Sequence, residues 1–258
     1  MKIARFSTGG DPRFGIVDGD DLVVLAGDPM FMGFDTLDER VPLDSVKLLA
    51  PVIPRSKIIG VGVNYRDPSD ESDVEDEEGL STPLIFLKPN TSIVGPGDTI
   101  QIPPVDGDMA HDGELAIVIG RVAKQISAEN YADYVFGYTV ANDVTALGVL
   151  EAEGQWTRAK GYDTFCPIGP VIETELDPLE LEITTFVDGE QRRSGNTRDM
   201  IHSVPEIIAF VSDIFTLLPG DIIVTGTPKG RPEFTDGQTI DITIEGIGTL
   251  SNPARNRA

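Results

Sequence analysis

Two carboxylates, Asp112 and Glu114, lie one residue apart at the start of an apolar run that extends to Gly120. The run is typical of a buried strand, and alternate residues of a strand point to the same face of a sheet. Two like charges held side by side are unfavourable unless a cation or a shared proton compensates them. The pair therefore has two interpretations: a cation site, or ordinary solvated charges at the end of a strand.

A third carboxylate, Asp143, ends a second apolar run that begins at residue 135. Three carboxylates from two neighbouring strands would suit a hard divalent cation such as Mg²⁺ or Mn²⁺, which prefers oxygen ligands. The spacing makes Asp112, Glu114 and Asp143 candidate metal ligands. On spacing alone, the alternative of solvated strand-end charges stays open.

The strongly negative net charge of the chain limits the kinds of molecule that it can bind. It has 258 residues, a formal net charge of −23 and a sequence pI of about 4.2. Nucleic acids and anionic membranes are bound through basic patches, so we expect neither as a partner. Acidic residues number 43 against 20 basic ones. This balance suits a cell with high internal salt, where screening weakens self-repulsion.

Cysteine content and hydropathy indicate the compartment. Cys166 is the single cysteine, so the chain can form neither an internal disulfide nor a multi-cysteine metal site. Its first residues lack the apolar stretch of a signal peptide, and no segment approaches the ~20 apolar residues of a membrane span. We therefore expect a cytoplasmic protein.

Short strand-like runs separated by turns dominate the chain. Those in the first fifty residues predict a small N-terminal β domain over 1–52, followed by a second domain over 53–258. Many short strands with few helices favour a β-rich α+β fold, a roll or barrel, over a doubly wound sheet. The strand-like runs cover residues 2–7, 13–17, 22–26, 57–63, 84–87, 115–120, 135–140, 181–187, 221–224 and 239–244.

Two helices and one unusual loop complete this organisation. One helix is expected over 127–133, and a second begins at the capping-box residues Ser203 and Glu206 and stops before Pro219. Eight of the thirteen residues over 67–79 are acidic, which predicts a solvated, mobile loop.

Eight sequence blocks follow one another in order from about residue 55 onward. They are residues 59–65 (Ile-Gly-Val-Gly-Val-Asn-Tyr), 83–89 (Pro-Leu-Ile-Phe-Leu-Lys-Pro), 113–120, 141–146 (Ala-Asn-Asp-Val-Thr-Ala), 155–161 (Gln-Trp-Thr-Arg-Ala-Lys-Gly), 165–170, 218–228 and 245–250. Together these blocks resemble the fumarylacetoacetate hydrolase family, whose members cleave, isomerise or decarboxylate small 2-oxo acids. The resemblance implies a mixed β-roll or barrel with a small N-terminal β domain, a homodimer, and Mg²⁺ or Mn²⁺ held by three carboxylates.

The resemblance implies roles for individual residues. The metal motif of the family, Glu-x-Glu followed later by Asp, maps onto Asp112, Glu114 and Asp143, with Asp112 shorter than the usual glutamate. A 2-oxo acid chelated by the metal would be activated toward an enolate.

Three further residues match positions that contact the substrate in the family. Lys160 matches the family lysine that faces the substrate and acts as a cation or a proton donor. Tyr65 and Thr227 match substrate-binding positions, Thr227 as a donor to the substrate carboxylate.

The chain departs from the family pattern at the residues that support hydrolysis. Pro68 replaces a histidine, Leu147 an arginine that binds a substrate carboxylate, and Leu150 a glutamine found in some members. Glu71 matches the glutamate that accompanies the histidine and is the remaining candidate base, acting through a water. These changes weaken attack by water more than enolisation, which needs mainly the metal and Lys160.

We therefore favour a metal-dependent isomerase or decarboxylase acting on a small 2-oxo or 2-hydroxy-dienoic acid, similar to 2-hydroxyhepta-2,4-diene-1,7-dioate isomerase. One alternative is a C–C hydrolase of acylpyruvate or fumarylpyruvate. The other is a catalytically silent protein that binds a metal and an acid. Of the remaining candidates, His111 is expected to be solvated at a strand edge, Cys166 to lie in the core, and Trp156 to pack beside the Lys160 segment.

Overall fold

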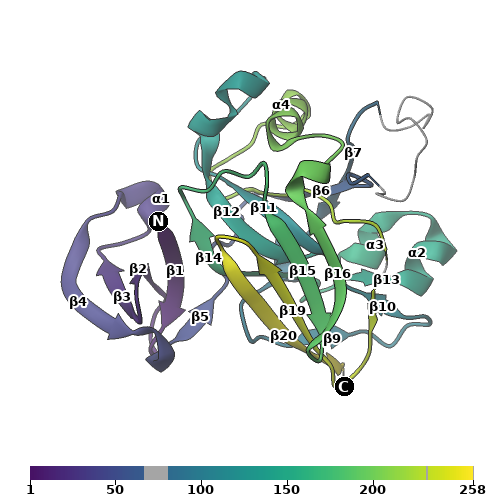
Figure 1. The fold of residues 1–258 in the computed structure, drawn as a ribbon, viewed down its shortest axis with the longest axis horizontal. Helices are drawn as coiled ribbons and strands as arrows, with labels where there is room; N and C mark the ends of the chain where they lie inside the picture. The colour runs from purple at the N-terminus through teal and green to yellow at the C-terminus, as the bar shows by residue number, and fades with distance from the viewer. Residues whose placement is uncertain (67–80, 231, 258) are drawn as a thin grey trace.

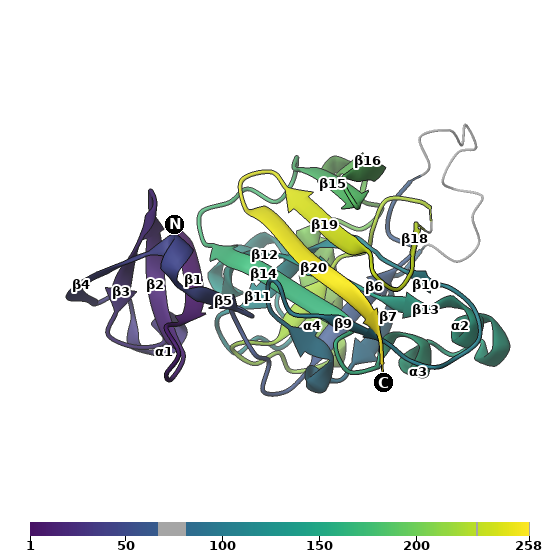
Figure 2. The same ribbon diagram turned by 90° about the horizontal axis from the view of Figure 1, so that it is seen from below.

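The computed structural model describes residues 1–66, 81–230 and 232–257. Within these residues the chain forms one twelve-stranded sheet, a five-stranded sheet and a three-stranded sheet. Figures 1 and 2 show the N-terminal strands at one end of the molecule and helices α2 and α3 at the other. The fold is a β-rich α+β architecture with a small N-terminal β unit, as expected.

The twelve-stranded sheet runs through the whole molecule. Its spatial order is β4 (Thr36–Pro42), β3 (Asp21–Leu25), β2 (Arg13–Asp18), β1 (Lys2–Ser7), β14 (Cys166–Glu173), β12 (Val135–Asn142), β11 (Gly113–Ile119), β17 (Ile222–Val224), β6 (Ile58–Gly62) and β7 (Leu84–Lys88). Outside this order, β5 (Lys47–Leu49) pairs with β1, and β8 (Ile93–Val94) pairs with β14.

The smaller sheets pack close to the centre of the large one. The five-stranded sheet crosses β11, β12 and β14 in Figure 1, and its strands contact all three. Its order is β16 (Glu190–Asn196), β15 (Glu182–Val187), β19 (Thr239–Ile244), β20 (Gly248–Asn256) and β9 (Ile100–Ile102). The three-stranded sheet has the order β13 (Thr145–Ala146), β10 (Met109–Ala110) and β18 (Glu233–Phe234).

Helices are few and short. The α-helices are α1 (Pro29–Met32), α2 (Leu147–Glu153), α3 (Trp156–Lys160) and α4 (Val204–Ile214). The 3₁₀ turns are η1 (Leu43–Ser45), η3 (Asn90–Ser92), η4 (Ala128–Tyr134) and η5 (Thr197–Asp199). Within the described ranges, no helix is long and apolar enough to cross a membrane.

The predicted helices are present with shifted limits, and three α-helices, α1, α2 and α3, were missed. The expected helix over 127–133 is the 3₁₀ segment η4. The capping box of Ser203 and Glu206 starts α4, which ends at Ile214 because Phe215 already has an extended backbone, earlier than expected. Helices α2 and α3 were not predicted, since seven and five residues are too few to show an apolar periodicity.

The N-terminal strands continue the large sheet instead of forming a sheet of their own. Strand β1 pairs antiparallel with β14, with Lys2 opposite Glu173 and Ile3 opposite Ile172. Ile3 and Ile172 belong to one buried cluster with Val52 and Ile58. The division of the chain at residue 52 stays a prediction, because hydrogen bonds and apolar packing cross it. The predicted acidic loop over 67–79 lies outside the described residues.

Candidate active site

A cavity of about 420 Å³ opens beside the ends of β11 and β12, near α2 and α3. This is within the size range of small-molecule sites. The predicted site residues Tyr65, Asp112, Glu114, Asp143, Lys160 and Thr227 all line it. The remaining lining residues are Val61, Gly62, Val63, Phe86, Ala110, Thr145, Leu147, Leu150, Trp156, Gly226, Pro228, Lys229 and Gly230.

The pairing of β11 with β12 brings the three carboxylates together. Gly113 lies opposite Asn142 in this antiparallel register. Beyond the ladder, the backbone N–H of Asp143 donates to the carbonyl of Asp112 at 2.9 Å. Glu114 and Asp143 are buried, and the Asp112 side chain is 17% exposed. The clustering expected from the spacing of the two runs is therefore present.

Two lysines hold Asp143. Lys160, at the end of α3, donates from Nζ to Asp143 Oδ2 at 2.5 Å and to Thr145 Oγ1 at 2.7 Å. Lys88, at the end of β7, donates to Asp143 Oδ1 at 2.5 Å. Burial raises the pKa of Asp143, but the two lysines outweigh burial and hold it below its ordinary value. Asp143 is thus an anion at neutral pH.

Glu114 has a less favourable environment. Its Oε2 accepts a hydrogen bond from the backbone N–H of Gly226 at 2.7 Å. Burial, reinforced by the charges of Asp143 and Asp112, raises the pKa of Glu114 well above its ordinary value. A buried carboxylate with this destabilised charge is a place where a cation would be stabilising.

The turn after β17 requires glycine at position 226. Gly226 has φ +89°, and a Cβ there would lie 2.9 Å from the Asn64 side chain and 3.0 Å from the Val61 carbonyl. The Asn64 amide donates to the Thr225 carbonyl at 2.8 Å and fixes the turn from the other side. The turn therefore holds the Gly226 N–H on Glu114 and places Thr227 at the cavity.

Arg193 enters the site from β16, a strand of the five-stranded sheet. Its side chain is buried, and Nη1 donates to Asp112 Oδ1 at 3.0 Å and to Thr227 Oγ1. Nη2 donates to the Gly230 carbonyl. Burial raises the pKa of Asp112 above its ordinary value, although Lys160 and Arg193 oppose this. Arg193 thus connects Asp112 to the turn that carries Thr227.

Replacing Arg193 with methionine is expected to destabilise the protein by about 3 kcal/mol, because Asp112 would lose a buried ionic partner. Urea unfolding measures the change. Arg192→Met is the matched control, since Arg192 is exposed on the same strand and pairs with Glu190. Adding Asp112→Asn to Arg193→Met should recover most of the loss. Equal stability of the Arg193 and Arg192 variants would contradict this assignment.

Aromatic side chains form one wall of the cavity beside Lys160. The Phe86 and Trp156 rings meet edge to face with centroids 5.2 Å apart. Lys160 Nζ lies 5.2 Å from the first centroid and 5.7 Å from the second. Trp156 packs beside the lysine, as expected from the sequence. The rings shield the Lys160 ammonium from solvent while their faces favour its charge.

Other lining residues shape the substrate space. Tyr65 is buried, and its hydroxyl has no hydrogen-bond partner among the described residues. Leu147 and Leu150 add apolar surface to the wall. The cavity therefore has a charged end at the carboxylates and an apolar side at α2.

A divalent cation fits the chemistry of this donor set, with one restriction. All three acids offer oxygen ligands, and Glu114 carries a charge that its surroundings do not compensate. As placed, however, no group of three acidic, histidine or cysteine side chains in the described part of the chain has the arrangement of a metal site. Both Asp143 oxygens already accept from lysines, so a cation would share this carboxylate with them.

The prediction for His111 was wrong. The residue is buried, and its Nε2 lies 3.1 Å from Thr185 Oγ1 on β15, because the five-stranded sheet covers this edge. Burial and the charges of Arg193 and Arg192 lower its pKa to about 4, so it is neutral at pH 7. Cys166 is buried as expected. Glu71 and Pro68 lie outside the described residues.

Sequence reasoning missed Lys88 and Arg193. A lone lysine at the end of the apolar strand Leu84–Lys88 was a usable signal, since a buried lysine requires a partner. Arg193 gave no comparable signal, because β16 is polar throughout and distant in sequence from the carboxylates.

Comparison with known proteins assigns the family. The model for fumarylacetoacetate (FAA) hydrolase C-terminal domains matches residues 57–255, and the model named Rv2993c-like, N-terminal matches residues 1–51. The chain belongs to the fumarylacetoacetate hydrolase family.

Relatives in this family differ in activity. The structure of 2-hydroxyhepta-2,4-diene-1,7-dioate isomerase from Mycobacterium marinum is similar with a TM-score of 0.90 and 42% identity, covering 100% of this chain and 99% of that one. The oxaloacetate tautomerase YisK of Bacillus subtilis is 42% identical over 81% of this chain and 73% of its own. The maleylpyruvate hydrolase of Sphingobium sp. SYK-6, solved with manganese(II) and pyruvate, has a TM-score of 0.82 and 32% identity, covering 100% of both chains.

Proposed function

We propose that this protein is a divalent-metal-dependent enzyme that interconverts keto and enol or dienol forms of a small 2-oxo diacid. The observation that carries the proposal is the buried Lys160 ammonium beside the three carboxylates, in a cavity whose wall includes Leu147 and Leu150. The isomerase and tautomerase relatives support this class of reaction. Mg²⁺ or Mn²⁺ is the proposed cofactor, held by Asp112, Glu114 and Asp143, and the manganese in a relative supports a divalent ion.

Charge balance favours a dianionic substrate. Among the charged side chains at the inner end of the site, Lys88, Lys160 and Arg193 balance Asp112, Glu114 and Asp143 when all are ionised; Lys229 also lines the cavity, but at an exposed position. A divalent cation would add two positive charges to this neutral set. Buried charge is stable only when compensated, so a substrate with two carboxylates would restore neutrality.

Lys160 is the proposed proton donor. Burial lowers its pKa, but the carboxylates of Asp143 and Asp112 outweigh burial and keep the pKa above the ordinary 10.5. The ammonium would give a proton to the enolate carbon and recover the proton released by the enol hydroxyl, so no proton is gained or lost overall. When bound, the metal polarises the 2-oxo group and stabilises negative charge on the enolate.

Two further residues are proposed to hold the substrate. Thr227, whose Oγ1 donates to the Gly113 carbonyl at 3.0 Å, presents its backbone at the cavity to a carboxylate. Tyr65 offers a buried hydroxyl with no partner in the described structure. Leu147 and Leu150 would pack on the carbon chain of the acid. The homodimer implied by the family resemblance also stays a proposal.

The test distinguishes four outcomes with one enzyme preparation. Oxaloacetate, 2-hydroxyhepta-2,4-diene-1,7-dioate and acetylpyruvate are each supplied with Mg²⁺, with Mn²⁺ or with EDTA. The expected result is metal-dependent enol–keto conversion or double-bond migration without loss of carbon. Release of CO₂ from oxaloacetate would identify a decarboxylase instead. Cleavage of acetylpyruvate to acetate and pyruvate as the fastest reaction would identify a hydrolase, and metal binding without turnover would identify a silent protein.

A further inference from the structure

A second cavity, of about 460 Å³, lies between the N-terminal strands and the rest of the molecule. We call it the inter-unit cavity. Residues of β1, β2 and α1 line one side, and residues of the connecting segment 51–55 and of β12 and β14 line the other. No residue of the described chain lines both this cavity and the candidate active site. It is therefore a separate site.

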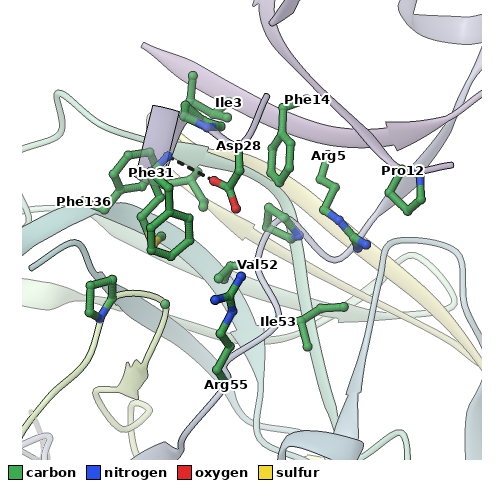
Figure 3. A pocket seen from close by; sticks show the side chains of 16 residues that line it. Ile3, Arg5, Pro12, Phe14, Asp28, Phe31, Val52, Ile53, Arg55 and Phe136 are labelled. Carbon is green, nitrogen blue, oxygen red and sulfur yellow. Dashed lines mark hydrogen bonds between the residues drawn. The ribbon is translucent and has the colours of Figure 1, made fainter. Parts of the chain in front are cut away.

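Most of the wall is apolar and includes aromatic rings. Figure 3 shows Phe14, Phe31 and Phe136 around the cavity, together with Ile3 and Ile53. Phe31 and Ile53 are each 52% exposed, which is unusual for large apolar side chains that line a concave surface. The cavity thus offers two or more ring faces to an apolar body of small-molecule size.

Two arginines, Arg5 and Arg55, stand beside this apolar wall, and the charge of Asp28 acts on Arg5. Arg5 donates from Nη1 to the Ala50 carbonyl at 3.3 Å. The Arg55 guanidinium lies over the Phe31 ring, 5.1 Å from its centroid. Neither forms an ion pair within the described chain, whereas Arg13, Arg40 and Arg198 each do. In a chain this rich in acids, the Arg55 guanidinium has no carboxylate partner among the described residues and is available for an anion, with Arg5 as a second cation on the same cavity.

Asp28 is the single acid among the described lining residues, and it is already engaged. Its Oδ1 accepts from the Met30 backbone N–H at 3.0 Å and caps α1, as the dashed line in Figure 3 shows. The cavity therefore presents two arginines and one carboxylate, and that carboxylate also accepts a hydrogen bond from the backbone of α1.

We propose that the inter-unit cavity is a second binding site, for a small carboxylate with an aromatic or branched aliphatic body. The body packs on Phe14, Phe31 and Phe136, and the carboxylate reaches Arg55 or Arg5 in charge-assisted hydrogen bonds. A concave, two-sided wall with cations on it matches a small amphipathic anion in both shape and charge. This proposal is independent of the reaction proposed for the carboxylate site.

The test is calorimetric titration of the full-length protein with 3-phenylpropionate, with Mg²⁺ and oxalate saturating the candidate active site. The expected result is one saturable site per chain. The neutral 3-phenylpropionamide should bind at least about tenfold more weakly, because it lacks the charge that the arginines recognise. The same two probes are then applied to variants.

Two substitutions at exposed residues of the cavity wall test whether the probes bind in the inter-unit cavity. Arg55→Gln should weaken binding of the carboxylate about tenfold and leave the amide unchanged. Ile53→Glu should abolish binding of both probes, because a charged side chain replaces apolar surface on which the ring of each probe packs, and it also repels the carboxylate. Arg198→Gln, at an exposed arginine far from the cavity in sequence, is the control and should bind like the parent.

Three results would overturn the proposal. The first is no saturable binding of 3-phenylpropionate. The second is binding that survives both Arg55→Gln and Ile53→Glu. The third is a lower molar mass of either variant by light scattering, since this would show that a second copy of the chain covers the cavity in solution.

Discussion

Replacing Lys160 with methionine is expected to lower kcat for enol–keto conversion by about a thousandfold, with a much smaller change in KM. Methionine fills a similar volume but carries neither a charge nor a proton. The fold should survive, because Asp143 keeps its second partner, Lys88. Steady-state kinetics at saturating Mg²⁺ measure the loss, and near-UV circular dichroism checks that the site remains packed.

The control for this experiment is Lys124→Met. Lys124 is exposed and donates to the Asp213 carbonyl at 2.6 Å, away from the cavity. It should leave kcat unchanged. A Lys160 variant that retains kcat within about tenfold would exclude Lys160 as the proton donor. Because the pKa of Lys160 is above 10.5, activity of the parent protein should show no loss from lysine deprotonation across neutral pH.

Replacing Glu114 with glutamine is expected to weaken Mn²⁺ binding by more than about a hundredfold. The amide keeps the size of the side chain and can still accept from the Gly226 N–H, but it removes the carboxylate charge that we propose the cation requires. Calorimetry or the electron paramagnetic resonance signal of free Mn²⁺ measures the affinity without any assay of activity. Unchanged stoichiometric binding would refute the proposed ligand.

The same variant should be more stable than the parent in EDTA at high pH. The pKa of Glu114 is raised in the folded state, so the folded protein holds this proton more tightly than the unfolded chain. The stability that this proton provides is present below the ordinary carboxyl pKa and is lost as pH rises through the raised folded value. Glutamine cannot lose a proton there, so its advantage should grow with pH.

Melting temperatures between pH 4 and pH 9 test this expectation. Glu182→Gln, at an exposed position of β15, is the control and should follow the parent. Adding Mn²⁺ should raise the melting temperature of the parent at pH 8 and leave that of the Glu114 variant unchanged. A variant less stable than the parent at pH 8 in EDTA would contradict a destabilised Glu114 charge.

The carboxylate cluster was predictable because its geometry is local. Two apolar runs, each with acids at one end, become neighbouring strands, and the period of a strand places Asp112 and Glu114 on one face. The same logic located about half of the strands, but not β14 or β20. The lysine at position 160 followed from the family resemblance and not from any periodicity.

The remaining features depend on contacts distant in sequence. Arg193 reaches Asp112 across 81 residues of chain, from a different sheet. His111 is buried by β15, which the sequence placed correctly as a strand but could not place on top of this edge. Helices α2 and α3 are short and are stabilised by packing near β13 and β7, and not by their own propensity.

The pairing of β1 with β14 determines where the large sheet ends. At one edge lies β4, in which Asp38, Glu39 and Arg40 are exposed, so charge discourages pairing with another chain. The first 51 residues thus cover the edge of β14 and end the sheet with a charged strand. A chain without them would leave the β14 backbone groups opposite Lys2 and Ile3 open, and the buried Ile172 beside them would become a starting point for aggregation.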